Sequence, residues 1–246
     1  MKYPFLSNNE LILVDYVPGS AGHLLLRLWS ELDSRLQYDN PQILTDLTIN
    51  EHKSTREVQF ELPIPKRMTN WFLDKCRPDS VHDYANYFEF LGTYLLASSQ
   101  KWNSDDNQSE KFYENESYRV QNRRILYGMH TWHKHIPFKE LQDMGYNIKC
   151  IAIVANSDEG RKFQHDRCKV CYPLTDIFWE KILPIYNNKS NSGVIYFDFC
   201  TLLANKNSTA IIDWLRIQLA SEFRSDKIER ANEILAAFYS EIVDNL

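Results

Sequence analysis

A short apolar run, followed by a glycine-containing turn and an amphipathic stretch, constrains the fold of this chain more than any other feature of its sequence. Residues 11–17 (Leu-Ile-Leu-Val-Asp-Tyr-Val) are nearly all apolar and rich in β-branched side chains. Such a run is typical of a strand that is buried on both faces, as in a parallel sheet. Pro18 and Gly19 break the run. Four leucines then follow at helical spacing, namely Leu24, Leu25, Leu28 and Leu32. Strand, turn and helix together predict the opening of a βαβ unit.

The remaining sequence repeats this alternation of strand and helix. Further strands are expected at residues 58–62, 124–129, 147–154 and 193–199. Helices are expected at residues 69–76, 80–100, 138–144, 158–167, 174–183, 208–223 and 226–243. Gly145 is expected to cap one helix in the left-handed conformation, and Pro184 to stop another. The pattern predicts a doubly wound α/β fold with a mainly parallel sheet flanked by helices.

Length and composition favour one domain. The chain has 246 residues, of which 43% are hydrophobic and 25% are charged, which is ordinary usage for a globular domain. We expect a single domain over residues 1–246 with a helical and loop insertion around residues 66–122. The polar, acidic run at residues 103–110 is expected to be a surface loop inside that insertion.

Charge and hydropathy narrow the possible partners and the location. The net charge of −5 argues against a broad nucleic-acid-binding surface, which needs clustered Lys and Arg. No apolar run approaches the roughly 18–20 residues of a membrane span, and residues 1–5 lack the apolar core of a signal peptide. Five scattered cysteines fit a reducing compartment. We therefore expect a soluble, cytoplasmic protein without nucleic-acid or membrane partners.

The turn after the first strand is a candidate anion-binding loop. Gly19, Ser20, Ala21 and Gly22 are small, so successive backbone N–H groups could point at one anion, and the next helix adds its positive dipole from His23 onward. The alternative is an ordinary tight turn in which Ser20 caps the helix. The turn lacks the Gly-Lys-Ser/Thr sequence of a Walker A loop, so it does not support hydrolysis of nucleoside triphosphates.

Three of the seven histidines follow the strand at 124–129. His130, His133 and His135 lie within six residues, and Lys134 adds a cation that could hold an anionic group. A histidine at the end of a strand is a candidate general base, because its pKa lies near neutral pH. The alternative is a structural or surface role. The spacing matches no strong zinc pattern, so no metal is expected.

Polar residues also follow the strands at 147–154 and 193–199. Asn156 and Ser157 are candidates for ligand contact, although Ser157 or Asp158 could instead cap the next helix. Asp198 could be a carboxylate at a strand end or an outward residue on an edge strand. A single Cys-x-x-Cys at Cys168 and Cys171 has no second pair, so two reduced, partly buried cysteines are the favoured interpretation.

Taken together, these segments resemble the sulfotransferases, a family with a P-loop-type fold. Residues 18–25 (Pro-Gly-Ser-Ala-Gly-His-Leu-Leu) resemble the family's 5′-phosphosulfate loop, which typically reads Pro-Lys/Arg-Ser-Gly-Thr-Thr. Residues 135–137 (His-Ile-Pro) are similar to its catalytic-histidine segment, Thr-His-Leu-Pro. Residues 147–160 look like the strand and turn that carry a phosphate-binding Arg, and residues 194–203 look like the family's late strand and helix. The similarity of order and spacing spans roughly residues 10–220.

This chain departs from the family pattern at several cationic positions. Gly19 stands in place of the basic residue of the loop, and Ala155 or Asn156 stands where the phosphate-binding Arg is expected. Phe163 falls near the position of that arginine's partner Ser. The family's C-terminal Arg-Lys-Gly-x-x-Gly segment is missing. A highly anionic donor needs cations, so Arg27, Lys134, Arg161 or Lys162 would have to replace the lost ones.

The resemblance implies an enzyme that transfers a sulfuryl group from 3′-phosphoadenosine 5′-phosphosulfate to a hydroxyl on a small molecule or glycan. The implied donor-binding residues are Gly19, Ser20, Ala21, Gly22, His23, Asn156 and Ser157. The implied base is His135 first, and His130 or His133 next. The alternative is a non-catalytic assembly module of the same fold, with protein partners or self-association. A kinase is a weaker third reading, because the P-loop Lys is absent.

Overall fold

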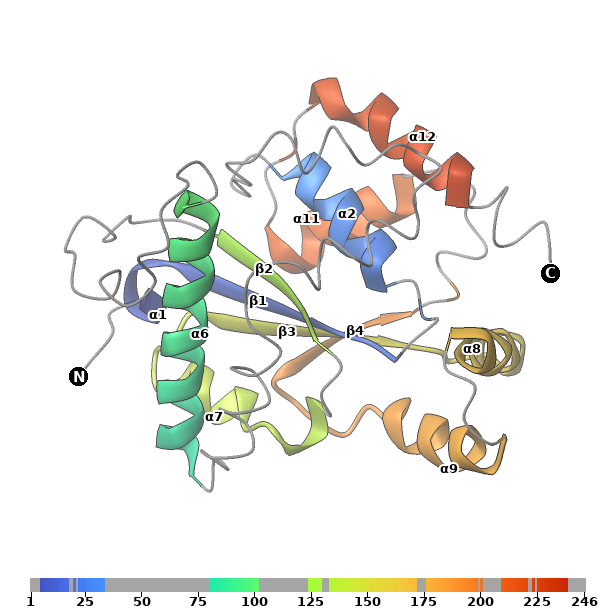
Figure 1. Cartoon of the computed structure of the whole chain (residues 1–246), viewed down its shortest axis with the longest axis horizontal. Helices are drawn as coiled ribbons and strands as arrows, with labels where there is room; N and C mark the ends of the chain where they lie inside the picture. The colour runs from blue at the N-terminus through green and yellow to red at the C-terminus, as the bar shows by residue number, and fades with distance from the viewer. Residues whose placement is uncertain are drawn as a thin grey trace.

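The computed structural model of the chain describes residues 5–17, 20, 22–33, 80–101, 124–129, 133–171, 176–198, 200, 209–220, 223 and 225–238. Within these ranges the sheet has four strands, all parallel, in the order β2-β1-β3-β4 (Figure 1). The strands are β1 (Glu10–Asp15), β2 (Arg124–Met129), β3 (Ile148–Val154) and β4 (Val194–Asp198). The α/β class and the parallel sheet expected from the sequence are confirmed.

Helices cover both faces of the sheet. One face carries α2 (Gly22–Leu32), α11 (Thr209–Leu219) and α12 (Ile228–Phe238) (Figure 1). The other carries α1 (Phe5–Asn8), α6 (Val81–Lys101), α7 (Phe138–Asp143) and α9 (Asp176–Tyr186). Helix α8 (Asp158–Cys171) follows β3 at the carboxyl end of the strands. The sheet is therefore the middle of three layers.

Strand β1 is buried along its whole length, as its sequence predicts. Ile12 and Val14 pack in the core under α2, whereas Leu11 and Leu13 pack in the core under α6 and α7. Burying one such side chain stabilises the fold by roughly 1.5–3 kcal/mol. The four leucines that predict helix α2 are all buried in the first of these cores. Alternate residues of β1 thus hold the two helical layers together.

Several boundaries differ from the expectations. The helix expected to stop at Leu183 instead continues through Pro184 to Tyr186, so that expectation is wrong. The helix tolerates Pro184 near its end, since only one N–H is lost there, and the N–H of Asn187 still donates to the oxygen of Leu183 at 2.8 Å. Helix α8 extends four residues beyond the expected end at residue 167, to Cys171.

The last two helices differ from their expected bounds, within the described residues. Helix α11 ends at Leu219, and Ala220 follows with a φ of 45°. A short 3-10 turn, η4 (Ser225–Lys227), precedes α12, which ends at Phe238. The left-handed cap expected after α7 is confirmed: Gly145 has a φ of 84°, and the N–H of Tyr146 donates to the oxygen of Leu141 at 3.1 Å.

Some expectations lie outside the described residues. These are the strand at 58–62, the helix at 69–76, the surface loop at 103–110 and most of the insertion at 66–122. Within that insertion, α6 is described and packs on α7 through Phe88 and Phe138, whose ring centroids lie 6.0 Å apart. Among the helices that the structure describes, none is long and apolar enough to cross a membrane.

Buried ion pairs close the amino end of the sheet. Arg124, the first residue of β2, pairs with Glu10 of β1 and with Asp33, which follows α2, while Lys149 Nζ lies 2.6 Å from Glu10 Oε1. Arg124 also donates to the backbone oxygen of Leu219 at 3.0 Å. The guanidinium satisfies several acceptors at once, so the charges of three strands and of Asp33 meet in one network, to which α11 adds a backbone oxygen.

We expect Arg124→Met to destabilise the fold by about 3–5 kcal/mol, because it leaves two carboxylates buried without their main cation. The matched control is Lys139→Met, which removes an exposed ion pair with Asp143 and should cost no more than about 0.5 kcal/mol. Urea unfolding of the three proteins measures both values. If the two variants lose the same free energy of unfolding, the buried network stabilises the fold no more than an exposed ion pair does.

Candidate functional site

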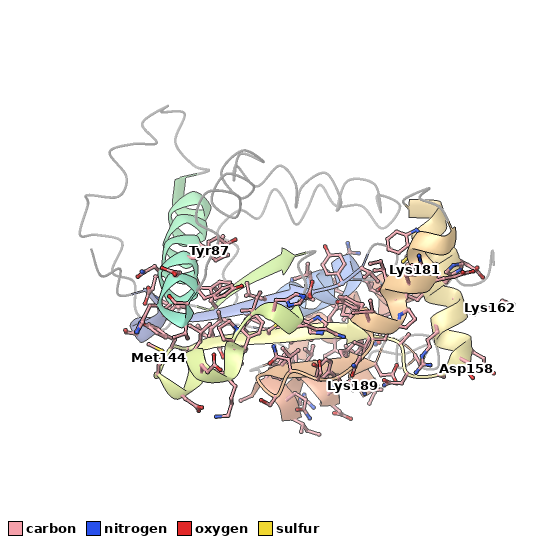
Figure 2. All side chains as sticks on the ribbon, turned by 90° about the horizontal axis from the view of Figure 1, so that it is seen from below. Tyr87, Met144, Asp158, Lys162, Lys181 and Lys189 are labelled. Atoms are coloured by element: carbon pink, nitrogen blue, oxygen red, sulfur yellow. The ribbon has the colours of Figure 1, made fainter. Side chains whose placement is uncertain are left out.

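The strand order places a topological switch point between β1 and β3. The chain leaves β1 toward β2 on one side, and β3 and β4 lie on the other side. In open parallel sheets, ligands bind at such a point, outside the carboxyl ends of the strands. Figure 2 shows Asp158 and Lys162 of α8 at this end of the molecule, away from Tyr87 and Met144. The segments after β1 and β3 therefore define the candidate site.

Of residues 18–21 in the loop between β1 and α2, the structure describes Ser20. It is fully buried, and its N–H donates to the oxygen of Val17 at 3.1 Å. Its hydroxyl oxygen accepts a hydrogen bond from Gln164 Nε2 at 2.7 Å. Gly19 and Ala21 lie outside the described residues, and His23 is described only as part of the first turn of α2. Of the residues expected to form the anion-binding loop, the structure therefore describes Ser20 and Gly22 fully.

Gly22, the first residue of α2, lies against an aromatic ring. A Cβ at this position would come within 2.1–2.4 Å of ring atoms of Tyr16, far closer than atoms can approach. Tyr16 is buried and also lies near Gly128 of β2. The structure therefore gives Gly22 a packing role that is independent of any bound anion.

A chain of side-chain amides links the Ser20 loop to the end of β3. The backbone N–H of Ala155, just after β3, donates to Asn187 Oδ1 at 3.0 Å. Asn187 Nδ2 donates to Gln164 Oε1 at 2.9 Å, and Gln164 Nε2 donates to Ser20. Gln164 is fully buried on α8, and Asn187 follows α9. The two sides of the switch point are joined through these two amides.

The side chains of the two residues that follow Ala155 form hydrogen bonds to other groups of the protein. Asn156 Nδ2 donates to Asp198 Oδ2 at 2.6 Å. Ser157 Oγ accepts the N–H of Gly160 at 3.0 Å, which is the helix-capping geometry that the alternative interpretation expects. Both side chains are exposed, so they still face solvent at the carboxyl edge.

The carboxylate of Asp198 ends β4 beside these residues. Partial burial raises its pKa, but hydrogen bonds from Asn156 and from the N–H of Cys200, 3.0 Å away, outweigh this effect and lower the pKa overall. Asp198 therefore stays ionised and holds Asn156 in place.

Cations at this edge are few and exposed. Arg161 Nε donates to the oxygen of Ala155 at 3.3 Å, and its Nη1 lies 3.7 Å from Asp158. Lys162 is exposed on α8. Burial lowers the pKa of Lys134, which is half-buried in the turn after β2. The side chain of Arg27 lies outside what the structure describes.

The structure describes two of the three candidate histidines, and they differ in burial. His130 lies outside the described residues. His135 is exposed at the end of the 3-10 helix η3 (His133–His135). His133 is fully buried and bound to Asp15, the last residue of β1. Asp15 Oδ2 lies 2.8 Å from His133 Nδ1 and accepts the backbone N–H of His133 at 3.0 Å.

Two tyrosines enclose the ring of His133. The rings of Tyr186 and Tyr196 meet it edge to face, with centroids 5.0 Å and 5.7 Å away. Both His133 Nε2 and the Tyr186 hydroxyl are buried without a hydrogen-bond partner. Burial, with the charge of Asp15 nearby, raises the pKa of Tyr186 well above its usual value, so its hydroxyl stays protonated. A ring nitrogen and a hydroxyl on two rings in contact therefore have unused hydrogen-bonding capacity.

Metal binding has no support in the described part of the chain. No group of three His, Cys, Asp or Glu side chains there could hold an ion. Cys168 is a free, buried thiol on α8, and only the backbone of Cys171 is described, at the end of the same helix. The same desolvation, with Asp15 nearby, raises the pKa of the buried Cys150 thiol well above its usual value, so this residue is not a nucleophile.

The sequence analysis missed four residues of this site: Asp15, Gln164, Tyr186 and Asn187. Asp15 carried a usable signal, since it is the one charge in the apolar run 11–17. A buried charge needs a partner, and the histidines after β2 were available. Gln164, Tyr186 and Asn187 carried no such signal, because polar residues in helices are usually exposed.

No protein-family model, curated protein or solved structure matches this chain at the significance that a relative requires. The functional argument therefore depends on the residues of the site and their geometry.

Gly22→Ala should destabilise the protein, because its methyl group cannot coexist with the present position of the Tyr16 ring. We expect a cost of about 1–3 kcal/mol in thermal or urea unfolding. In a Tyr16→Leu background the same substitution should cost clearly less, since the ring is gone. An equal cost in both backgrounds would contradict the packing role.

His133 should carry its hydrogen on Nδ1. The carboxylate of Asp15 can only accept, so the nitrogen 2.8 Å away must donate, and in the neutral ring Nε2 is then the bare nitrogen. Imidazole ¹⁵N shifts of the neutral ring, assigned by comparison with His133→Gln, should show a protonated Nδ1 and an unprotonated Nε2. A neutral ring that carries its hydrogen on Nε2 would contradict this tautomer.

Proposed function

We propose that this chain is a divergent transferase of the P-loop type, organised as a single domain. It binds 3′-phosphoadenosine 5′-phosphosulfate at the carboxyl edge of the sheet and transfers its sulfuryl group to a hydroxyl. The observation that carries this proposal is the buried Nε2 of His133, which has no hydrogen-bond partner, on a ring held by Asp15 at the end of β1, the strand that precedes the loop into α2. A base held by a carboxylate next to a candidate anion loop is what transfer to a hydroxyl requires.

The proposed transfer needs only the donor, the acceptor hydroxyl and a histidine. The acceptor hydroxyl loses its proton to a histidine as its oxygen forms a bond to sulfur. The bond between sulfur and the bridging oxygen of the phosphosulfate breaks, and 3′-phosphoadenosine 5′-phosphate leaves with the electron pair. Asp15 stabilises the imidazolium that forms, through its bond to Nδ1.

Of the three histidines, His133 is the best supported base. His135 matches the family segment by position but is exposed. His133 is fully buried, its ring is held by Asp15 and packs edge to face on Tyr186, and its Nε2 has no hydrogen-bond partner. The acceptor oxygen would lie between that nitrogen and the Tyr186 hydroxyl.

The donor would lie along the first turn of α2. Backbone N–H groups of residues 19–23 and the Ser20 hydroxyl would hold the 5′-phosphosulfate, helped by the dipole of an 11-residue helix. Arg161 and Lys162, at the start of α8, are the described cations at this edge that could face the phosphate groups. Asn156 and Ser157 would contact the nucleotide from the other side of the switch point.

A second candidate is a non-catalytic module that keeps this fold for assembly with other proteins or with itself. The bonding of the residues after β3 favours it: Asn156 is bound to Asp198, Ser157 caps α8, and Arg161 bonds to a backbone oxygen. These contacts are all internal, as a purely structural edge would require.

Binding of 3′-phosphoadenosine 5′-phosphate should raise the melting temperature of the chain. A ligand at a hundred times its Kd adds about 2.7 kcal/mol, and each kcal/mol corresponds to roughly 2–4 °C for a chain of this size. Ser20→Ala should reduce the shift, whereas Lys139→Ala, at the opposite edge of the sheet, should leave it unchanged. Adenosine serves as the ligand control without phosphate, and ATP tests the kinase reading.

An unchanged melting temperature at millimolar nucleotide would refute the donor site. In that case light scattering would test the assembly module, which requires a stable oligomer. A monomer that binds no nucleotide would refute both candidates.

A further inference from the structure

The amide chain between Ala155 and Ser20 has a fixed direction. A backbone N–H can only donate, so the atom of Asn187 that faces Ala155 must be its carbonyl oxygen. The other end of that amide is then an NH2 group, which must donate to Gln164 Oε1. Gln164 in turn presents its own NH2 group to Ser20. One backbone donor therefore sets the orientation of both side-chain amides.

This direction decides what Ser20 can do. Its hydroxyl oxygen accepts from Gln164 at 2.7 Å, so its own hydrogen must point elsewhere. Ser20 is fully buried, and the described residues record no acceptor for that hydrogen. Each donor in a chain also polarises the next, which strengthens the last donor. The Ser20 hydroxyl is thus prepared to donate to an acceptor that is not yet present.

A second observation concerns the residue next to Asn187. Asn187 is preceded by Tyr186, whose hydroxyl is buried without a hydrogen-bond partner and whose ring meets the ring of His133 edge to face, where Nε2 is also without a partner. Tyr186, which contacts His133, and Asn187, which belongs to the amide chain, are therefore consecutive residues at the end of α9. Unused polar groups on both sides of this point indicate that a polar ligand completes them.

We infer that Gln164 and Asn187 are positioning residues that turn the Ser20 hydroxyl hydrogen toward a bound oxyanion, a phosphate or sulfate ester that only accepts hydrogen bonds. This inference rests on the proposed function, and it adds selectivity to it. A protonated amine cannot use this hydrogen and has to share Ser20 Oγ with Gln164, whereas an oxyanion receives a hydrogen bond there. Neither positioning residue touches the ligand.

The isosteric substitution Asn187→Asp reverses the chain. An aspartate still accepts the N–H of Ala155, but its second oxygen can no longer donate to Gln164. Gln164 then rotates its amide to donate to the aspartate, and its oxygen faces Ser20. The Ser20 hydroxyl must donate inward and is lost to the ligand. The shape of the site stays the same, so a merely structural role predicts no change in binding.

The test measures the Kd of 3′-phosphoadenosine 5′-phosphate by calorimetry for four variants and the wild type. A hydrogen bond to a charged acceptor is strong, so we expect Asn187→Asp to weaken binding about tenfold or more. The exposed neighbour Asn188→Asp adds the same charge outside the amide chain and should weaken binding by only about twofold. Gln164→Glu presents an acceptor to Ser20 directly and should act like Asn187→Asp, which provides a second route if one variant fails to fold.

The decisive comparison uses Ser20→Ala as the background. With the hydroxyl gone, adding Asn187→Asp should cost no more than Asn188→Asp does, so the two substitutions are strongly non-additive. The positioning role of Gln164 and Asn187 would be overturned if the changes in Kd were additive, or if Asn187→Asp and Asn188→Asp weakened binding equally in the wild-type background. The donor site itself would stand. If the wild type does not bind 3′-phosphoadenosine 5′-phosphate, the proposed function is overturned, and the positioning role of Gln164 and Asn187 with it.

Discussion

The buried carboxylate of Asp15 organises the carboxyl edge of this protein. It lies at the end of the central strand β1, where no water can solvate it, so it must be satisfied by the protein. It binds both the backbone and the ring of His133, which fixes the turn after β2 beneath the end of β1. Tyr186 of α9 and Tyr196 of β4 then close around that ring. A single buried charge thus brings four elements together.

The two edges of the sheet use polar groups in opposite ways. At the amino edge, Arg124 joins Glu10 and Asp33 in buried ion pairs, and the charges there are mutually compensated. At the carboxyl edge, the Ser20 hydroxyl hydrogen, His133 Nε2 and the Tyr186 hydroxyl have no acceptor or partner among the described residues. Closed networks stabilise a fold, whereas unused buried groups cost free energy unless something binds them. This contrast is why we place function at the carboxyl edge.

The end of α9 connects the two parts of the candidate site. Tyr186 contacts the histidine that would take a proton, and Asn187 orients the serine that would hold the anion. A ligand that shifts one of these residues must therefore affect the other. Donor binding and the acceptor's proton transfer would be coupled through two adjacent backbone positions, and no larger movement of the sheet is needed.

The sequence by itself determined the strands β1 to β4, helix α2 and the cap at Gly145, because these depend on the local spacing of apolar residues and on one glycine's backbone freedom. It also placed Ser20 and the histidines after parallel strands, and hence near one edge. Only the tertiary structure decided that His133 is buried and held by a carboxylate, and that Gln164 orients Ser20. Those partners lie 118 and 144 residues apart in the chain, so no local pattern encodes their meeting. Long-range pairing is fixed by how the helices pack on the sheet, and that packing is a property of the whole fold.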